Sequence, residues 1–281
     1  MKRLCILALA LSSISALAQS GPFEITSKLG RKLYALPDDG SIASARTTLA
    51  TDPKNPKLIL ALSKAQAGRR QYREAVATDT EGLGYQPSDG SLLLERGHRE
   101  LGLREFDAAK RDLDQATIIT PNELQAWYHL GMANYFLSDF NAAAAGFGHA
   151  RSLAKSDDDL IDTSNWLYVS LRRAGKEKEA TGILTRITPE VKAKEAHLAF
   201  YLQLLRFYQG KITEARLLPP PPTPGDIESE LAFATSHYAI GNWHLYHGDT
   251  AGAKALFAPV VQGEAWNAWG FIGSETELAG R

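Results

Sequence analysis

Cysteine is almost absent from this chain of 281 residues, which contains only Cys5, inside an apolar run near the N-terminus. The residues up to Ala18 have the layout of a segment that is removed on export, and its removal would leave no cysteine. Such a chain has no disulfide, no thiolate metal site and no cysteine nucleophile. A packed core must therefore stabilise it, and the length is ample for that.

The chain also lacks an excess of charge of either sign. It has 31 Lys and Arg against 32 Asp and Glu, and removing Lys2 and Arg3 with the leader changes the balance to 29 − 32 = −3. No basic footprint for a nucleic acid is present. Beyond the leader, no apolar run approaches the ~20 residues that span a bilayer. The sequence therefore predicts no nucleic-acid partner and no transmembrane segment in the mature chain.

Catalytic signatures are missing as well. The sequence has no H-E-x-x-H, no G-x-S-x-G and no glycine loop of the phosphate-binding type. His244 and His247 stand i, i+3, but no third metal ligand is evident near them, which favours ordinary polar helix positions. We therefore expect no catalytic residues, no metal site, no cofactor and no enzymatic activity. An accessory part of an enzyme, in the N-terminal segment or the last repeat, is the alternative from another class.

The N-terminus has the three parts of a secretory signal. A basic dipeptide opens it, an apolar run follows from residue 4 to residue 11, and a small-residue A-L-A sequence ends at Ala18. This pattern predicts cleavage after Ala18 and export to the periplasm or beyond. A short membrane anchor is the alternative, but the run is well below the ~20 residues that a spanning helix needs.

The stretch Leu124–Ala154 predicts two amphipathic helices with a break near residues 137–139. Large and small residues share one face of each helix. These residues are Trp127, Leu130 and Gly131 in the first helix and Ala143, Phe147 and Ala150 in the second. Because glycine costs roughly 1 kcal/mol in a helix interior, Gly131 indicates a seam where the two helices approach closely.

These residues read W-x-x-L-G and then A-x-x-x-F, a pattern that resembles the tetratricopeptide repeat (TPR) family. Pro87 and Pro121 close two successive units, and 121 − 87 = 34 is the period of that family. The central unit departs from the pattern at Asn134, where an aromatic residue is usual, and at Lys155, where proline is usual. The resemblance implies an all-α, right-handed α-solenoid of about five to six TPR-like helix pairs with a C-terminal capping helix.

The repeat frame divides the chain into five parts. They are the signal peptide over residues 1–18, an N-terminal capping segment over 19–51, repeats one to five over 52–218, a proline-rich connector over 219–225, and the final repeat with its closing helix over 226–281. In the capping segment we expect short helices over Ser27–Ala35 and from Ser41. Four consecutive prolines favour a stiff, extended connector, and a ligand for a proline-binding module is the alternative.

The chain also shows a distant resemblance to NlpI-type bacterial envelope repeat proteins. It rests on the central W-Y-H-L-G segment and on the later N-W-L-Y, G-D-x-x-x-A and W-x-x-x-G-F-I segments. That family consists of lipid-anchored adaptors that bring envelope proteases and peptidoglycan enzymes together. Because this sequence lacks the lipid-attachment cysteine, the anchoring does not carry over to it.

In an array of this kind the first helices of the repeats line a concave groove that binds an extended peptide or a partner helix. The expected groove stripe lies away from the Trp127 seam and is rich in aromatic residues and arginine, which interface hot spots favour. Its members are Lys64, Glu95, His98, Arg99, Tyr128, His129, Met132, Tyr135, Asn165, Trp166, Arg172, Tyr201, Tyr238 and Asn242. The alternative is that these side chains pack between neighbouring helices.

The sequence thus predicts a non-enzymatic, exported scaffold that binds a protein or peptide in its concave groove. An NlpI-like adaptor is one alternative, and a structural homodimer is another. Asn165 and Arg172 alone do not make the Lys/Asn/Arg set with which some members of the family hold a terminal carboxylate. The partner cannot be named from the sequence, because one repeat scaffold serves many partners.

Overall fold

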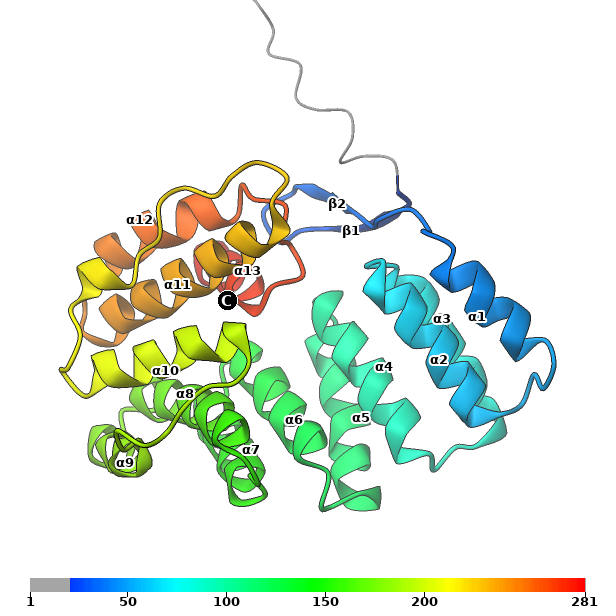
Figure 1. Cartoon of the computed structure of the whole chain (residues 1–281), viewed down its shortest axis with the longest axis horizontal. Helices are drawn as coiled ribbons and strands as arrows, with labels where there is room; N and C mark the ends of the chain where they lie inside the picture. Colours follow the sequence, from blue (N-terminus) through cyan, green and yellow to red (C-terminus); the bar gives the residue numbers. More distant parts are fainter. Residues whose placement is uncertain (1–20, 281) are drawn as a thin grey trace, which may run out of the picture.

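The computed structural model describes residues 21–280, except for the side chains of residues 196 and 197. The predicted signal peptide and its cleavage point lie outside the described residues. The described chain is an α-solenoid whose antiparallel helix pairs stack side by side along a curve (Figure 1). The predicted all-α solenoid is therefore confirmed. Among residues 21–280 no helix combines the length and the apolar character that crossing a bilayer requires.

Five complete helix pairs build the array within residues 21–280. They are α2 (Pro56–Gly68) with α3 (Tyr72–Tyr85), α4 (Gly90–Gly102) with α5 (Phe106–Ile119), α6 (Leu124–Phe136) with α7 (Phe140–Ser152), α8 (Asp157–Arg173) with α9 (Glu177–Ile183), and α11 (Ile227–Tyr246) with α12 (Thr250–Val260). Helix α1 (Ser41–Leu49) packs before the first pair, and α13 (Trp269–Ala279) follows the last. Polar side chains cap many of the N-termini; at α8, Ser156 and Asp159 form a reciprocal capping box.

The central seam lies where the sequence predicts it, in the pair α6–α7. A Cβ atom on Gly131 would come within 2.9 Å of the Phe147 ring, so only glycine permits this approach. The same relationship recurs between Gly241 and Phe257 in the last pair. Trp127 is only half-buried and stacks on His149 with a centroid distance of 3.9 Å. It therefore lies at the edge of the seam.

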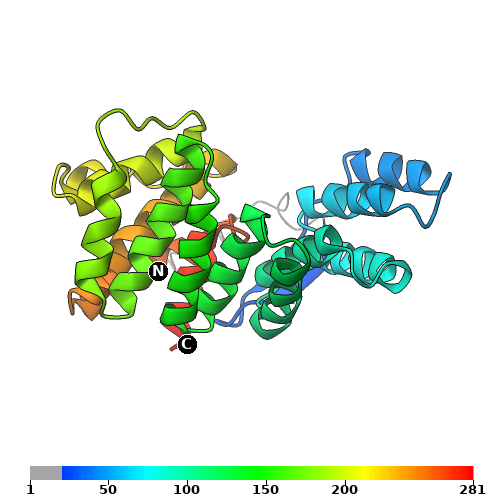
Figure 2. The ribbon, with the colours of Figure 1, turned by 90° about the horizontal axis from the view of Figure 1, so that it is seen from below.

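The fifth repeat is incomplete. Its first helix, α10 (Ala196–Tyr208), packs against α8, but the region of its second helix forms only the 3-10 turn η2 (Glu214–Arg216). The prolines that begin at Pro219 follow within three residues and cannot continue a helix. The limb formed by α1 to α3 extends away from the body that contains the later repeats (Figure 2).

The expected short helix over Ser27–Ala35 is wrong. This segment belongs to an antiparallel hairpin of β1 (Phe23–Thr26) and β2 (Lys32–Tyr34). The turn between the strands places Gly30 at a φ of 84°, a left-handed conformation that a helix cannot include. Ile25 and Leu33 are buried under the hairpin, so its apolar positions serve a sheet face instead of a helix face.

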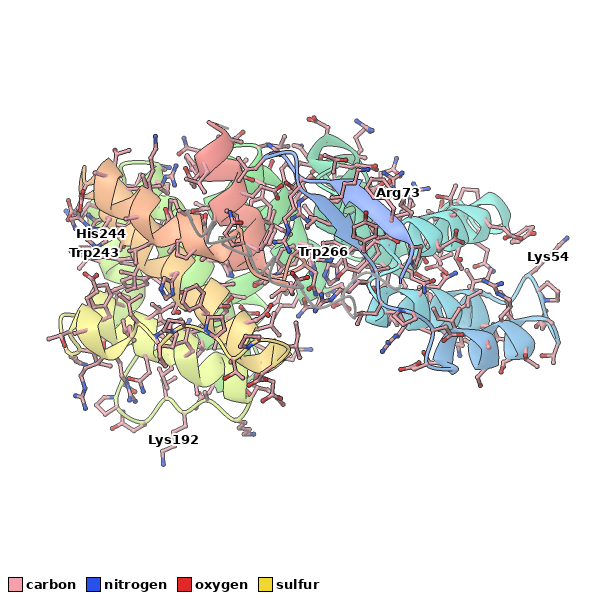
Figure 3. All side chains as sticks on the ribbon, turned by 90° about the horizontal axis from the view of Figure 1, so that it is seen from above. Lys54, Arg73, Lys192, Trp243, His244 and Trp266 are labelled. Atoms are coloured by element: carbon pink, nitrogen blue, oxygen red, sulfur yellow. The ribbon has the colours of Figure 1, made fainter. Side chains whose placement is uncertain are left out.

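The hairpin joins the two ends of the described chain. Trp266 Nε1 donates to Tyr34 O at 2.9 Å, and Arg31 Nη1 donates to Gly263 O at 2.6 Å. On its other side Arg73 N donates to the Glu24 carboxylate at 3.0 Å (Figure 3). The predicted N-terminal cap therefore does more than cover the first repeat, because it ties the early repeats to the C-terminal segment.

Candidate peptide-binding site on the concave face

The predicted groove stripe is mostly buried by the chain itself. Glu95, His98, Arg99, Arg172 and Tyr201 are half-buried, and Lys64 is exposed. The remaining eight are buried, namely Tyr128, His129, Met132, Tyr135, Asn165, Trp166, Tyr238 and Asn242. The prediction that these eight side chains are exposed along an open groove is therefore wrong. They pack between neighbouring helices, as the alternative interpretation of the sequence had it.

Helix α11 covers one part of the stripe. Tyr238 Oη donates to Tyr135 Oη at 3.0 Å, and Asn242 Nδ2 donates to the same hydroxyl at 2.6 Å. Arg173 of α8 donates to Asn242 Oδ1 at 2.9 Å and pairs with Glu277 of α13 at 2.6 Å. The last repeat thus folds back onto the first helices of the third and fourth repeats.

Helix α13 covers a second part of the stripe. The Trp269 ring lies 5.5 Å from the His98 ring and 6.1 Å from the His129 ring, and the two imidazoles lie 4.1 Å apart. Burial lowers the pKa of His129 to about 4 and that of His98 well below its usual value. Both rings are therefore neutral in the closed structure at pH 7.

A charged group on α2 and α4 forms a third part of the stripe, and of its members only Lys64 is exposed. Lys64 pairs with Glu95 at 3.1 Å, and Glu95 also accepts from Arg99 one turn away. Arg99 Nη1 lies 2.9 Å from His98 Nδ1. The Lys64 side chain is 59% exposed, so its pair with Glu95 contributes little to stability. The Glu95 and Arg99 side chains are only 16% and 11% exposed, so their pair lies below the surface.

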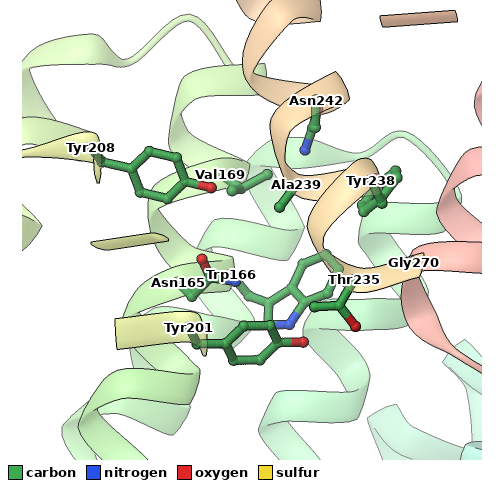
Figure 4. A pocket seen from close by; sticks show the side chains of 10 residues that line it. All are labelled: Asn165, Trp166, Val169, Tyr201, Tyr208, Thr235, Tyr238, Ala239, Asn242 and Gly270. Carbon is green, nitrogen blue, oxygen red and sulfur yellow. The ribbon is translucent and has the colours of Figure 1, made fainter. Parts of the chain in front are cut away.

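A small pocket remains between α8, α10 and α11 (Figure 4). Asn165 and Trp166 line it from α8, and Tyr201 and Tyr208 line it from α10. Asn165 Oδ1 and Tyr208 Oη are buried without a hydrogen-bond partner among the described residues. The space between these walls is about 20 Å³, enough for one water-sized polar group.

Five residues of this pocket belong to the predicted stripe, namely Asn165, Trp166, Tyr201, Tyr238 and Asn242. The residues missed by the sequence analysis are Val169, Tyr208, Thr235, Ala239 and Gly270. Tyr208 could have been found, because it stands at i+7 from Tyr201 and so shares its face of α10 (208 − 201 = 7). Gly270 could not, since only the fold brings α13 to this place.

A buried carboxyl group lies beside the pocket. Tyr128 Oη donates to Asp162 Oδ1 at 2.9 Å. Burial raises the pKa of Asp162 to about 7, despite the opposing effect of this hydrogen bond. Burial and the nearby Asp162 also raise the pKa of Tyr201, so its hydroxyl stays protonated. The site can thus offer hydroxyl, amide and carboxyl groups to a polar ligand.

The two histidines considered as metal ligands make other contacts. His244 lies 2.8 Å from Asp249 and 3.3 Å from Glu214, whereas His247 Nδ1 lies 2.8 Å from the carbonyl oxygen of Trp243. In the part of the chain that the structure covers, no group of three His, Cys, Asp or Glu side chains is placed to hold a metal ion.

The solved structures that resemble this chain decide the fold type. A tetratricopeptide repeat protein from Parabacteroides merdae superposes with a TM-score of 0.52 at 18% identity, over 85% of this chain and 91% of that one. The fold is a TPR solenoid. A chain of the APC/C hetero-tetramer Cut9–Hcn1 superposes with a TM-score of 0.50 at 14% identity, over 80% of this solenoid and 44% of that chain.

The sequence comparison matches a smaller part of the chain. The heat-shock protein cognate co-chaperone sgt12 of Aspergillus fumigatus is 26% identical over 131 residues, which are 44% of this TPR solenoid and 38% of that protein. The chain therefore spans well under two thirds of that relative's length. No family model matches the chain.

Proposed function

We propose that the protein is a non-enzymatic, exported scaffold that binds a protein partner through an extended peptide segment. The pocket between α8, α10 and α11 would receive one polar group of that segment. The observation that carries this proposal is the pair of buried, unpartnered polar atoms, Asn165 Oδ1 and Tyr208 Oη, at the pocket. A buried polar group without a partner costs about 1–3 kcal/mol, and a ligand that supplies the missing hydrogen bond recovers it. Similarity to a TPR fold and to a co-chaperone supports the protein-binding class.

The test is affinity capture of partners from the exported fraction with the purified protein and its Tyr208→Phe variant. A hydrogen bond is worth about 0.5–1.5 kcal/mol, so we expect the variant to bind a captured partner roughly 2- to 12-fold more weakly. Its melting temperature should be unchanged or higher, because the lost hydroxyl has no partner among residues 21–280. Tyr85→Phe, which removes a hydroxyl on the exposed end of α3, is the matched control.

If the protein and its Tyr208→Phe variant bound the partner equally well, the pocket would not be part of the binding site. An envelope protease or a peptidoglycan enzyme among the captured partners would support the finer proposal of an NlpI-like adaptor. Export itself is proposed from the leader sequence. N-terminal sequencing of the protein from the periplasmic or secreted fraction should begin at Gln19, and an intact Met1 there would contradict cleavage after Ala18.

A further inference from the structure

The concave pocket between α8, α10 and α11 carries hydrogen-bond acceptors that are left without a partner. Asn165 Oδ1 is an acceptor, and Tyr208 Oη can accept as well as donate. Neither atom has a partner in the part of the chain that the structure describes. Trp166 Nε1, a donor on the same wall, lies beside the hydroxyl oxygens of Tyr128 and Tyr201, which can accept from it. A ligand group that only donates hydrogen bonds therefore suits the pocket best.

A carboxyl group adds negative charge beside these acceptors. Asp162 and Asn165 stand i, i+3 on α8, so their side chains are neighbours on the same side of the helix. Tyr201, which lines the pocket, lies close enough to Asp162 for the charge of that carboxylate to raise its pKa. The end of the pocket that Asn165 and Tyr201 form is therefore next to a carboxylate.

The Asp162 carboxyl group lies in a recess. Protein atoms surround it closely enough to raise its pKa to about 7, yet part of the surface of the residue stays accessible. Its Oδ1 accepts from Tyr128 Oη at 2.9 Å, and no second hydrogen bond to this carboxyl group comes from the described residues. The group is therefore within reach of a ligand and keeps acceptor capacity at Oδ2.

The charges around Asp162 leave its own charge uncompensated. Among the described residues, the charge that affects its pKa belongs to Asp159, one turn earlier on α8, and it has the same sign. By contrast, the buried carboxylate of Glu275 pairs with Arg104 at 2.8 Å. Carboxylates in such surroundings are normally paired with a cation. The surroundings of Asp162 therefore favour a cation that residues 21–280 do not supply.

The dimensions of the pocket favour a compact cation. Its space of about 20 Å³ holds one water-sized group, and an ammonium group is of that size. A planar guanidinium pairs best with both oxygens of a carboxylate at once, but Asp162 Oδ1 is already engaged by Tyr128. An ammonium group has three donors and no acceptor, which matches the acceptors Asn165 Oδ1 and Asp162 Oδ2.

We propose that the polar group bound in this pocket is the ε-ammonium of a lysine side chain in the peptide segment of the partner. The ammonium would donate to Asn165 Oδ1 and pair with the Asp162 carboxylate. The methylene stem of the lysine would lie against the rings of Tyr201 and Trp166, which line the pocket. This inference rests on the proposed function, because it names the side chain that the scaffold would recognise.

The test uses two defined probes, the acetylated and amidated tripeptide Ala-Lys-Ala and the same peptide with neutral norleucine in place of lysine. Binding to the purified protein at about pH 8, where Asp162 is mostly ionised, is followed by the NMR signal of the Trp166 indole N–H. We expect the lysine peptide to bind roughly tenfold more tightly, because it alone supplies charge-assisted hydrogen bonds. Asp162→Asn keeps an acceptor for Tyr128 and should abolish that difference. Asp157→Asn, which neutralises an exposed carboxylate at the start of α8, should preserve it.

A second measurement needs no variant. A bound cation stabilises the ionised carboxylate, so saturation with the lysine peptide should lower the pKa of Asp162 by about one unit or more in a carboxyl carbon NMR titration. The norleucine peptide should leave that pKa unchanged.

Equal affinity of the two peptides, tighter binding of the corresponding arginine peptide, no change of the Trp166 signal, or an unchanged pKa of Asp162 would overturn the proposal. A captured partner that binds the protein and Asp162→Asn equally well would refute this inference alone. Lysine selectivity with no partner captured from the exported fraction would instead refute the proposed scaffold function and leave the lysine site in place.

Discussion

Arg104 and Glu275 form an ion pair of 2.8 Å across 171 positions of the sequence. Their side chains are 6% and 0% exposed. Glu275 also accepts from Lys28 N at 2.5 Å, and Arg104 Nη2 donates to Trp266 O at 3.0 Å. One buried carboxylate thus joins the N-terminal hairpin, the second repeat and the C-terminal helix.

Glu275→Ala should therefore destabilise the whole fold. Removing one partner of a buried ion pair leaves the other charge unpaired, which costs about 3–5 kcal/mol. The measurement is the free energy of unfolding in urea. The control is Asp114→Ala, because Asp114 pairs with Lys110 on the surface and such a pair is worth about 0–1 kcal/mol. If Glu275→Ala lowered the free energy of unfolding no more than the control does, the ion pair of Arg104 and Glu275 would contribute little to stability.

The repeat architecture could be predicted because its signals are local. Gly131 and Phe147 stand in the same pair of neighbouring helices, and the pattern repeats with a fixed period. The helix from Ser41 was likewise predicted from its start signal and is observed as α1. The hairpin was missed because its turn and its short strands gave a loosely periodic leucine pattern that also suits a helix.

The contacts that join the early repeats to the C-terminal segment could not be predicted, because they connect segments that are far apart in the sequence. Arg70 and Arg104 stand 104 − 70 = 34 positions apart in equivalent turns, with φ values of 57° and 65°. The third repeat has Ser138 at this turn, with a φ of 66°, and the fourth and last repeats have Gly175 and Gly248. Both arginines donate to the C-terminal segment, at Glu264 and Glu275. Arginine is unusual at a turn with a positive φ, so Arg70 and Arg104 were a signal in the sequence. The residues that they contact are evident only in three dimensions.

The seam between α6 and α7 predicts opposite effects for two glycines of the central repeat. Gly131→Ala should destabilise the protein by roughly 1–3 kcal/mol, because the new methyl group would lie 2.9 Å from the Phe147 ring. Gly148→Ala is the control, since a Cβ atom there meets nothing within 4 Å. Alanine favours a helix by up to about 1 kcal/mol over glycine, so this change should be neutral or stabilising. Thermal unfolding of both variants measures the difference, and similar effects would contradict the tight seam.

The imidazoles of buried His129 and half-buried His98 make the packing under α13 sensitive to acid. His129 has a pKa of about 4 in the folded protein, against about 6.5 in an unfolded chain. As the pH falls from 7 toward 4, the unfolded state takes up a proton first, so the folded state loses stability. The loss from His129 is on the order of 3 kcal/mol. Arg99 disfavours the charged ring, Glu95 favours it, and the His98 ring lies 4.1 Å from it.

Other buried groups stabilise the folded state as the pH falls. The test must therefore compare the protein with a variant that lacks the His129 imidazole. Carboxyl groups whose pKa is raised by burial favour the folded state as the pH falls, and they are Glu24, Asp79, Glu100 and Asp162. The pH dependence of unfolding should be compared between the protein and His129→Phe over pH 7 to 4. We expect the variant to lose less stability on acidification. Parallel curves would mean that His129 is protonated equally in both states.

The pair of Tyr128 and Asp162 gives the last prediction. The tyrosine hydroxyl donates to the carboxylate at 2.9 Å and lowers its pKa, whereas burial raises it to about 7. Tyr128→Phe should therefore raise the pKa of Asp162 further, by about one unit, since a hydrogen bond to a charged group is worth about 1.5–3 kcal/mol. The shift is measured by carboxyl carbon NMR during a pH titration. Tyr201→Phe is the control, because Tyr201 lies near enough for the Asp162 charge to raise its pKa but does not contribute to the pKa shift of Asp162. An unchanged pKa of Asp162 in Tyr128→Phe would show that Tyr128 does not stabilise the carboxylate. The polar character of this side of the concave pocket would then rest on Asn165 and Tyr208 alone.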